Sequence, residues 1–276
     1  MATLYASNLV SFDNGLFSLT AETQEYLLKK SPNYFGYFWD MMYDNSETFS
    51  LKNLESAIKK NKSQVYEEQA LFNTHTYDAE KVRKFTQSMH SVSMSSASFW
   101  PTKISLTQYH KALDIGGGSG AHSIGMVTNW SNLNSTIFDL PEVCSLAADY
   151  IQQYGLSSRI ETCAGNMWED NFPDADLHLY SNVLHDWPTE KNLFLAKKSY
   201  DALPKGGRII IHEILYNDVG PGPLAAAASS LVMLGWTEGR QYSGKEFSLL
   251  LTQAGFQHVE VIPSFGYHSI VTAIKS

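Results

Sequence analysis

The second half of the chain alternates short apolar segments with longer helical ones, and this pattern limits the possible folds most strongly. The expected strands are Ala112–Ile115, Thr136–Phe138, Arg159–Cys163, Leu177–Tyr180 and Arg208–His212. Helical segments lie between them, two of which follow Pro141 and Pro188, and proline suits the first turn of a helix. Because the strands are apolar on both faces, they predict a parallel sheet covered by helices on both sides.

The last part of the chain extends this pattern. Two helical stretches, Leu224–Trp236 and Lys245–Ala254, follow the fifth strand, and two closing strands are expected near His258–Ile262 and Tyr267–Ile274. The fold class is therefore α/β, with a sheet of up to seven strands.

The N-terminal part has a different character. Apolar runs flank Asp13-Asn14-Gly15, and Asn-Gly supplies the positive φ angles of a tight hairpin. Thr20 can cap a helix that runs through Leu28, and residues 31–103 are helical in pattern. A hairpin followed by a helix resembles the wing of a winged-helix unit. Only seven residues precede Asn8, so we expect such a unit to lack its leading helices. The predicted division is residues 1–103, helical and winged-helix-like, and residues 104–276, the α/β domain.

Composition excludes several classes. The net charge of −8 argues against a general nucleic-acid binder, which needs a basic face to neutralise phosphates. The two cysteines indicate no disulfide framework, and the histidines and cysteines lack metal-ligand spacing, so no metal is expected. The N-terminus carries no signal-peptide pattern, and the longest apolar runs are too short to span a bilayer. We therefore expect a cytoplasmic protein with no membrane or nucleic-acid partner.

A glycine loop follows the first expected strand of the α/β domain. Gly116, Gly117, Gly118 and Gly120 allow positive φ angles and a close approach of a ligand to the backbone. The loop lacks the Gly-Lys-Ser/Thr ending of a triphosphate-binding loop. Asp139 ends the next strand, where an acid can bond both ribose hydroxyls of NAD or of S-adenosylmethionine. A simpler interpretation makes Asp139 a helix cap.

Six motifs, taken in order and spacing, resemble one family. They are Leu113-Asp-Ile-Gly-Gly-Gly-Ser-Gly120, Phe138-Asp-Leu-Pro141, Gly165-Asn-Met-Trp168, Leu184-His-Asp-Trp187, Pro204-Lys-Gly-Gly-Arg208 and Gly239-Arg-Gln-Tyr-Ser243. The chain resembles the S-adenosylmethionine-dependent O-methyltransferases of the caffeate, acetylserotonin and antibiotic-tailoring type. The resemblance implies a class I methyltransferase domain, with a Rossmann-like seven-stranded sheet, and a smaller winged-helix-like part that forms a dimer. We expect a homodimer, weakened if the N-terminus is truncated.

The chemistry of the resemblance centres on His185. A phenol with a pKa of about 10 is protonated at neutral pH, and a histidine with an ordinary pKa of about 6.5 can accept its proton. The resemblance places Glu213 beside that histidine and a glutamate where this chain has Gln241, so we expect either a weaker base or more reliance on Glu213. Asp186 is expected to shape the same loop.

The remaining candidate residues divide between cofactor and acceptor. Asp114 could orient the glycine loop or reach the amine of a ligand through water. Asn166 and Ser181 replace an acid and a basic residue that the family often has, and Ser93 and Trp100 are added from their position on the linking helix. The candidate cofactor residues are Asp114, Gly116, Gly118, Asp139, Leu140, Asn166, Met167, Ser181, Ser93 and Trp100. The acceptor candidates, each of which could instead be plain core, are Met89, Trp187, Met233 and Trp236.

The leading hypothesis is methyl transfer from S-adenosylmethionine to a hydroxyl of a small aromatic acceptor. One alternative is a relative that binds the same cofactor but catalyses decarboxylation, hydroxylation or rearrangement. A DNA-binding regulator and an NAD-dependent dehydrogenase are weaker alternatives, because the chain is acidic and nothing in it matches the catalytic half of a dehydrogenase.

Overall fold

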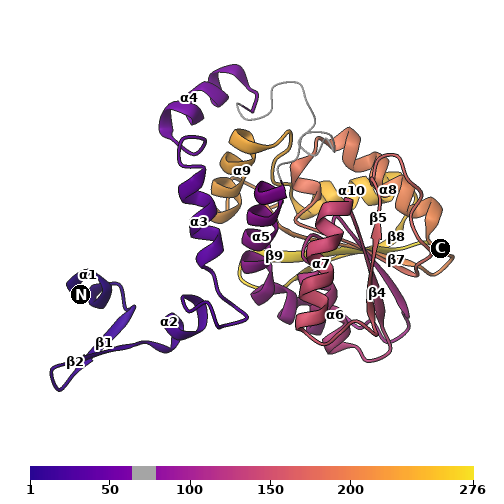
Figure 1. The fold of residues 1–276 in the computed structure, drawn as a ribbon. Helices are drawn as coiled ribbons and strands as arrows, with labels where there is room; N and C mark the ends of the chain where they lie inside the picture. Colours follow the sequence, from indigo (N-terminus) through magenta and orange to yellow (C-terminus); the bar gives the residue numbers. More distant parts are fainter. Residues whose placement is uncertain (64–78) are drawn as a thin grey trace.

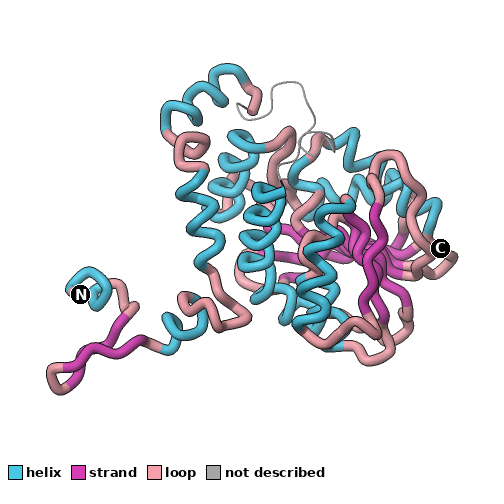
Figure 2. The backbone as a smooth tube through the Cα atoms, viewed as in Figure 1, coloured by secondary structure: helices cyan, strands magenta, loops and turns pink. Residues whose placement is uncertain are grey.

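A seven-stranded sheet forms the centre of the molecule in the computed structural model, which describes residues 1–63 and 79–276. Its strand order is β5-β4-β3-β6-β7-β9-β8. The sheet lies inside the larger part of the molecule, with helices around it (Figures 1 and 2). The strands are β3 (Lys111–Ile115), β4 (Asn134–Asp139), β5 (Ile160–Ala164), β6 (Leu177–Ser181), β7 (Arg208–Ile214), β8 (Gln257–Pro263) and β9 (His268–Ile274). The first five pair in parallel, whereas β9 is antiparallel to both of its neighbours, β7 and β8. The carboxyl ends of β3 to β7 therefore meet at one edge of the sheet.

Helices cover both faces of this sheet. The helices that follow the strands are α6 (Ala121–Asn129), α7 (Pro141–Gln153), α8 (Thr189–Ala202), α9 (Leu224–Trp236) and α10 (Gly244–Ala254). Helix α5 (Ala79–Phe99) packs against α6 and α7 on one side, while α8 packs against α10 (Figure 1). Two short 3₁₀ helices, η1 (Trp100–Lys103) and η2 (Leu184–Asp186), follow α5 and β6. The expected α/β architecture is confirmed.

The core has three buried clusters. One contains Tyr180, Phe247 and Phe256 between β6, α10 and β8, and another contains Ala97, Ile124 and Ala147 between α5, α6 and α7. A third joins η1 to the sheet. It includes Trp100 and Ile104, on either side of the expected division after residue 103, so that division stays a prediction.

The N-terminal part begins with α1 (Ala2–Ala6), a short helix that the sequence pattern did not predict. The hairpin of β1 (Val10–Asp13) and β2 (Leu16–Leu19) confirms the prediction, and Asn14 and Gly15 both have positive φ angles. Thr20 caps α2 (Ala21–Tyr26) by accepting from the N–H of Thr23, and this helix ends two residues earlier than expected. Helices α3 (Gly36–Asp44) and α4 (Leu51–Lys60) follow, while the predicted helical pattern over 64–78 lies outside the described residues.

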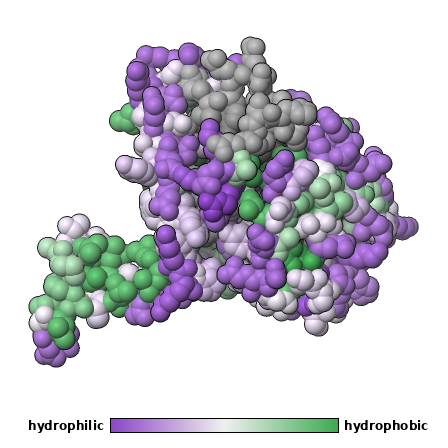
Figure 3. Space-filling view, in the orientation of Figure 1, coloured by the Kyte–Doolittle hydropathy of each residue, from purple (hydrophilic) through white to green (hydrophobic). Residues whose placement is uncertain are grey.

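The hairpin unit, residues 1–27, extends away from the body of the molecule (Figure 1). Its surface is mostly apolar in Figure 3, and its exposed side chains include Tyr5, Phe12, Leu16 and Phe17. Helix α3 connects it to the body by packing against α5. Within the described ranges, the helices are too short or too polar to cross a membrane.

Candidate active site

The glycine loop lies between β3 and α6, at the carboxyl edge of the sheet. Gly116, Gly118 and Gly120 all have positive φ angles, which a residue with a side chain adopts only at a cost. The N–H of Gly116 donates to the carbonyl of Phe138 on β4. A Cβ at Gly118 would meet nothing within 4 Å, so the loop presents its backbone to open space there. This is the geometry of a loop against which a ligand can lie.

Asp139 ends β4 and holds the loop from the neighbouring strand. Its Oδ2 accepts from the N–H of Gly118 at 2.8 Å, and its Oδ1 accepts from the N–H of Leu140 at 2.7 Å. Burial raises the pKa of the carboxyl to about 6, although both backbone bonds favour the charged form. Each oxygen keeps a free lone pair, so the side chain can also accept from ligand hydroxyls.

Asp114 acts within the protein. Its Oδ2 accepts from the hydroxyl of Ser123 on α6 at 2.7 Å, and the side chain is buried. Burial raises its pKa to about 6. This placement fits the expectation that Asp114 orients the loop, because it ties β3 to the helix that the loop opens.

Asn166 and Met167 follow β5 at the same edge. The Oδ1 of Asn166 accepts from the N–H of Trp168 at 3.0 Å, and its own N–H donates to Asp170. The side-chain oxygen is thus already used once, and the amide NH₂ is the more available group. The carbonyl of Met167 accepts from Lys198 at 2.7 Å. Both residues are partly exposed.

His185 lies in η2 beside two acids. Its Nδ1 is 2.7 Å from Oε2 of Glu213, close enough for an ion pair although the alignment falls outside hydrogen-bond geometry. Its Nε2 is 3.6 Å from Oδ1 of Asp186. Burial opposes the charged ring, but the carboxylates of Glu213 and Asp186 outweigh it and raise the pKa of His185 to about 9. With Nδ1 facing Glu213, Nε2 is the nitrogen that can exchange a proton with a substrate.

Glu213 on β7 also supports the backbone of this histidine. Its Oε1 accepts from the N–H groups of Val183 and Leu184, each at 3.1 Å, and from that of His185 at 3.4 Å. The side chain is 1% exposed. One carboxylate therefore fixes both the turn that carries the histidine and the face of its ring.

Three further residues hold the same turn. Gly239 and Tyr242 belong to the motif Gly239–Ser243, although neither was assigned a role from the sequence, and Asn192 lies outside every motif. The amide of Asn192 on α8, fully buried, donates to the carbonyls of Leu184 and Trp187. The hydroxyl of Tyr242 donates to the carbonyl of Trp187 at 2.6 Å. Gly239 packs so closely that a Cβ there would overlap the carbonyl oxygen of His185. A polar residue at a buried helical position was the available clue to Asn192.

Within the described residues, Gln241 makes no hydrogen bond to His185. Its side chain is buried, and its Oε1 has no hydrogen-bond partner within the described part of the chain. Its backbone N–H donates to Ser230 of α9 at 3.3 Å. This geometry agrees with the expectation that His185 relies on Glu213 more than on Gln241.

Ser181 and Trp100 belong to a buried polar row. The indole N–H of Trp100 donates to Nδ1 of His122 at 3.0 Å, and Nε2 of that ring is 2.9 Å from the hydroxyl of Ser181. The same hydroxyl is 3.0 Å from Nδ1 of His212, whose Nε2 is 3.3 Å from the hydroxyl of Ser264. Burial lowers the pKa of His122 to about 3, so this ring is neutral.

This row bears on the predicted cofactor contacts of Trp100 and Ser181. Trp100 is fully buried and its N–H is already used, so it cannot contact a cofactor as expected. Ser181 is partly exposed, but its hydroxyl is already engaged by two histidines. Ser93 is partly exposed on α5, and its carbonyl accepts from the hydroxyl of Ser96.

The acceptor candidates separate into two groups. Trp236 stacks on Phe49 and on Phe85, with ring centroids 5.4 and 6.5 Å apart. Met89 lies one helical turn from Phe85 on α5, and Met233 one turn from Trp236 on α9, so each shares a face with a stacked ring. Both methionines are partly buried.

Trp187 lies apart from this group. Its ring is 2% exposed and packs edge to face on Trp168 at 4.8 Å, while Lys191 lies over it. This placement favours a packing role for Trp187 over the expected contact with an acceptor.

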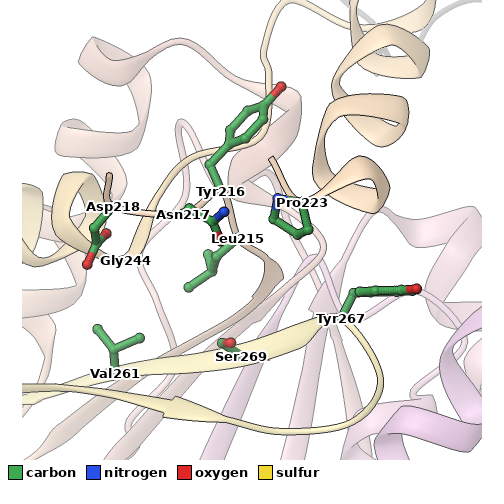
Figure 4. A pocket seen from close by; sticks show the side chains of 9 residues that line it. All are labelled: Leu215, Tyr216, Asn217, Asp218, Pro223, Gly244, Val261, Tyr267 and Ser269. Carbon is green, nitrogen blue, oxygen red and sulfur yellow. The ribbon is translucent and has the colours of Figure 1, made fainter. Parts of the chain in front are cut away.

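Two cavities lie near this edge, but neither is lined by His185 or by a described residue of the glycine loop. The larger, about 960 Å³, lies between α9, the end of α4 and residues 237–240. The smaller, about 280 Å³, is drawn in Figure 4, where Val261 and Ser269 on β8 and β9 face Tyr216 and Pro223.

Comparisons with known proteins agree with this geometry. A family model described as "O-methyltransferase domain" matches residues 51–257. The chain is 30% identical to a 3-hydroxy-5-methyl-1-naphthoate 3-O-methyltransferase of Streptomyces sahachiroi, over 98% of this chain and 79% of that one. It is also 30% identical to the acetylserotonin O-methyltransferase of Gallus gallus, over 90% of this chain and 72% of that one.

A solved structure extends the likeness to the whole fold. The structure of human N-acetylserotonin methyltransferase in complex with SAM superposes with a TM-score of 0.89 at 25% identity, and covers 100% of this chain and 81% of that one. The expected seven-stranded methyltransferase sheet with a helical N-terminal region is confirmed. The chain belongs to the O-methyltransferase family and is an S-adenosylmethionine-dependent O-methyltransferase.

Proposed function

We propose that His185 is the general base that removes a proton from an acceptor hydroxyl, with Glu213 as the residue that orients and charges it. The observation that carries the proposal is the 2.7 Å contact between Nδ1 of His185 and Oε2 of Glu213 in a buried turn. This contact leaves Nε2, which lies 3.6 Å from Oδ1 of Asp186, as the ring nitrogen that can accept a proton. A histidine whose ring is oriented and stabilised in its charged form by a carboxylate is a common arrangement for general base catalysis.

The residues at the sheet edge fit an adenosyl cofactor. The glycines of the loop expose backbone that no side chain covers. Each carboxylate oxygen of Asp139 accepts one backbone N–H and can accept a second hydrogen bond, from a ribose hydroxyl. Leu140, Met167 and Asn166 would border the adenine. When bound, S-adenosylmethionine supplies an electrophilic methyl group on a sulfonium.

The chain's own residues then do the remaining work. His185 takes the proton as the acceptor oxygen gains charge, and Glu213 stabilises the resulting imidazolium. Since the ring is charged at neutral pH in the free enzyme, it must first release its own proton.

We infer a flat aromatic acceptor. The stacked rings of Phe49, Phe85 and Trp236 and the two flanking methionines form an apolar, polarisable wall. The two O-methyltransferase relatives are named for aromatic hydroxyl compounds, a naphthoate and acetylserotonin. The alternative of a non-methylating relative has no comparable support.

The test is methyl transfer from labelled S-adenosylmethionine to a panel of hydroxynaphthoates, hydroxyindoles and simple phenols. We expect label on the oxygen of at least one acceptor, and a loss of about 10²-fold or more in kcat for His185→Gln. Nuclear magnetic resonance of the product separates oxygen from carbon methylation. Product without label, or an unchanged rate in His185→Gln, would contradict the proposal.

We also propose that the hairpin unit mediates a homodimer. Leu16 is 74% exposed, and apolar side chains gather on the same unit (Figure 3). A second copy of the chain is the proposed partner, because an apolar surface of this kind is costly to leave in water. Light scattering of the wild type and of Leu16→Glu/Phe17→Glu tests this, and a monomeric wild type would refute it.

A cytoplasmic location is proposed from the two unpaired cysteines.

A further inference from the structure

His90 reaches from α5 to the glycine loop. Its Nδ1 lies 2.8 Å from the hydroxyl of Ser119, which stands between two glycines of positive φ. Both side chains are buried, with 6% and 3% of their surfaces exposed. The contact therefore joins the middle of the loop to a helix that precedes the sheet in the sequence.

The ring of His90 is itself held in place. It stacks on Tyr150 of α7, with centroids 3.9 Å apart and planes inclined by 18°. Burial lowers its pKa to about 4, so the ring is neutral and shares one hydrogen bond with the serine hydroxyl. A fixed, neutral ring can position the hydroxyl without placing a charge beside a sulfonium.

Two other anchors of the loop backbone come from β4. Gly116 donates to the carbonyl of Phe138, and Gly118 donates to Asp139, so both anchors belong to β4 or its end. Next to Gly118 there is open space. His90 supplies a further restraint, from α5.

We propose that His90 is a positioning residue that holds the glycine loop, through Ser119, in the form that binds S-adenosylmethionine. The proposal concerns the cofactor only and is independent of the role proposed for His185. It assigns to His90 a function that its position in a mostly polar helix did not indicate.

Two substitutions separate the hydrogen bond from the ring stack. His90→Phe keeps a ring on Tyr150 but removes the bond, whereas His90→Asn keeps a polar group near the position of Nδ1 but removes the stack. Calorimetric titration of the full chain with S-adenosylhomocysteine should give about tenfold weaker binding for His90→Phe, because the buried hydroxyl loses its partner. His90→Asn should stay within about threefold of the wild type.

Further measurements distinguish positioning from general stability. In turnover assays, His90→Phe should raise KM for S-adenosylmethionine about tenfold while kcat at saturation stays unchanged. Adding Ser119→Ala to His90→Phe should cause little further loss, because the two changes remove one contact. Ser105→Ala, at an exposed serine, serves as the matched control.

The proposal is overturned if His90→Phe binds S-adenosylhomocysteine as tightly as the wild type. It is also overturned if His90→Asn loses as much affinity as His90→Phe and has a lower Tm, since the stack on Tyr150 would then be the important contact. A fall in kcat with unchanged cofactor affinity would likewise contradict it.

Discussion

Replacing Glu213 with glutamine removes one charge and turns one acceptor oxygen into a donor NH₂ group, and the structure predicts a large effect. The Oε1 of the glutamine can still accept from the backbone N–H groups of Val183 and Leu184, in the turn that carries His185 (the catalytic turn). Its NH₂ group then faces Nδ1 of His185, where the carboxylate oxygen was 2.7 Å away. The ring must accept that hydrogen bond on Nδ1, and its proton moves to Nε2. The nitrogen that faces the acceptor hydroxyl is then no longer a base.

The magnitude follows from the pKa of His185. The rise from 6.5 to about 9 corresponds to roughly 3 kcal/mol in favour of the imidazolium, at about 1.4 kcal/mol per pH unit. The same attraction stabilises the imidazolium that forms during proton transfer, so its loss slows the reaction about 10²-fold. The wrong tautomer adds to this loss, and we expect kcat to fall by about 10² to 10⁴.

The assay is methyl transfer at saturating cofactor between pH 6 and 9.5, with S-adenosylhomocysteine binding as the test of an intact fold. In the wild type, kcat/KM should rise with pH towards a plateau above about 9, because His185 must be neutral to act. In Glu213→Gln the rise should move to lower pH and the plateau should drop. Glu260→Gln, at an exposed glutamate of β8, is the control. Unchanged turnover across this range would refute the reasoning.

Four other outcomes are expected. Gly239→Ala should displace the catalytic turn and lower kcat, with a loss of about 1–3 kcal/mol in urea unfolding; wild-type kcat would contradict this. Asn192→Ala should cost about 2 kcal/mol, measured in the same way, because two buried carbonyls lose their donor. Asp139→Asn should weaken S-adenosylhomocysteine binding at least about tenfold in calorimetry, since an amide cannot accept from two backbone N–H groups on separate oxygens. Because the pKa of His185 is raised from 6.5 to about 9 in the folded state, this residue contributes up to roughly 3 kcal/mol to the free energy of unfolding below about pH 6.5. The contribution is lost as the pH rises through 9, and His185→Gln should lack that decline in stability.

Most of the fold could be predicted because its local patterns are strong. The apolar runs locate the strands within one or two residues. Pro141, the first residue of α7, and Pro188, the N-cap of α8, locate the starts of these two helices. The antiparallel insertion of β9 between β7 and β8 could not be derived from periodicity, because pairing between distant strands leaves no local trace. Helix α1 was missed because a five-residue helix has no apolar period to detect.

The candidate site was only partly predictable, for a different reason. Positions tied to backbone geometry, such as Gly118 and Asp139, lie where the motif spacing placed them. Residues that support a neighbour, such as His90 and Asn192, could not be identified from the sequence, because their contacts form only when the chain folds. Trp100 was misassigned because nearness along the chain to a site does not say which way a side chain points.

The buried row that begins at Trp100 has a direction. An indole nitrogen can only donate, so Nδ1 of His122 must accept, and the one proton of this neutral ring sits on Nε2. That proton goes to the hydroxyl of Ser181, which in turn donates to Nδ1 of His212, because the nearby carbonyl of His212 is farther away and already bonded. A single aromatic side chain at the start of the row therefore dictates the proton position on every ring after it, and Trp100→Phe would leave that sequence of protons free to reverse.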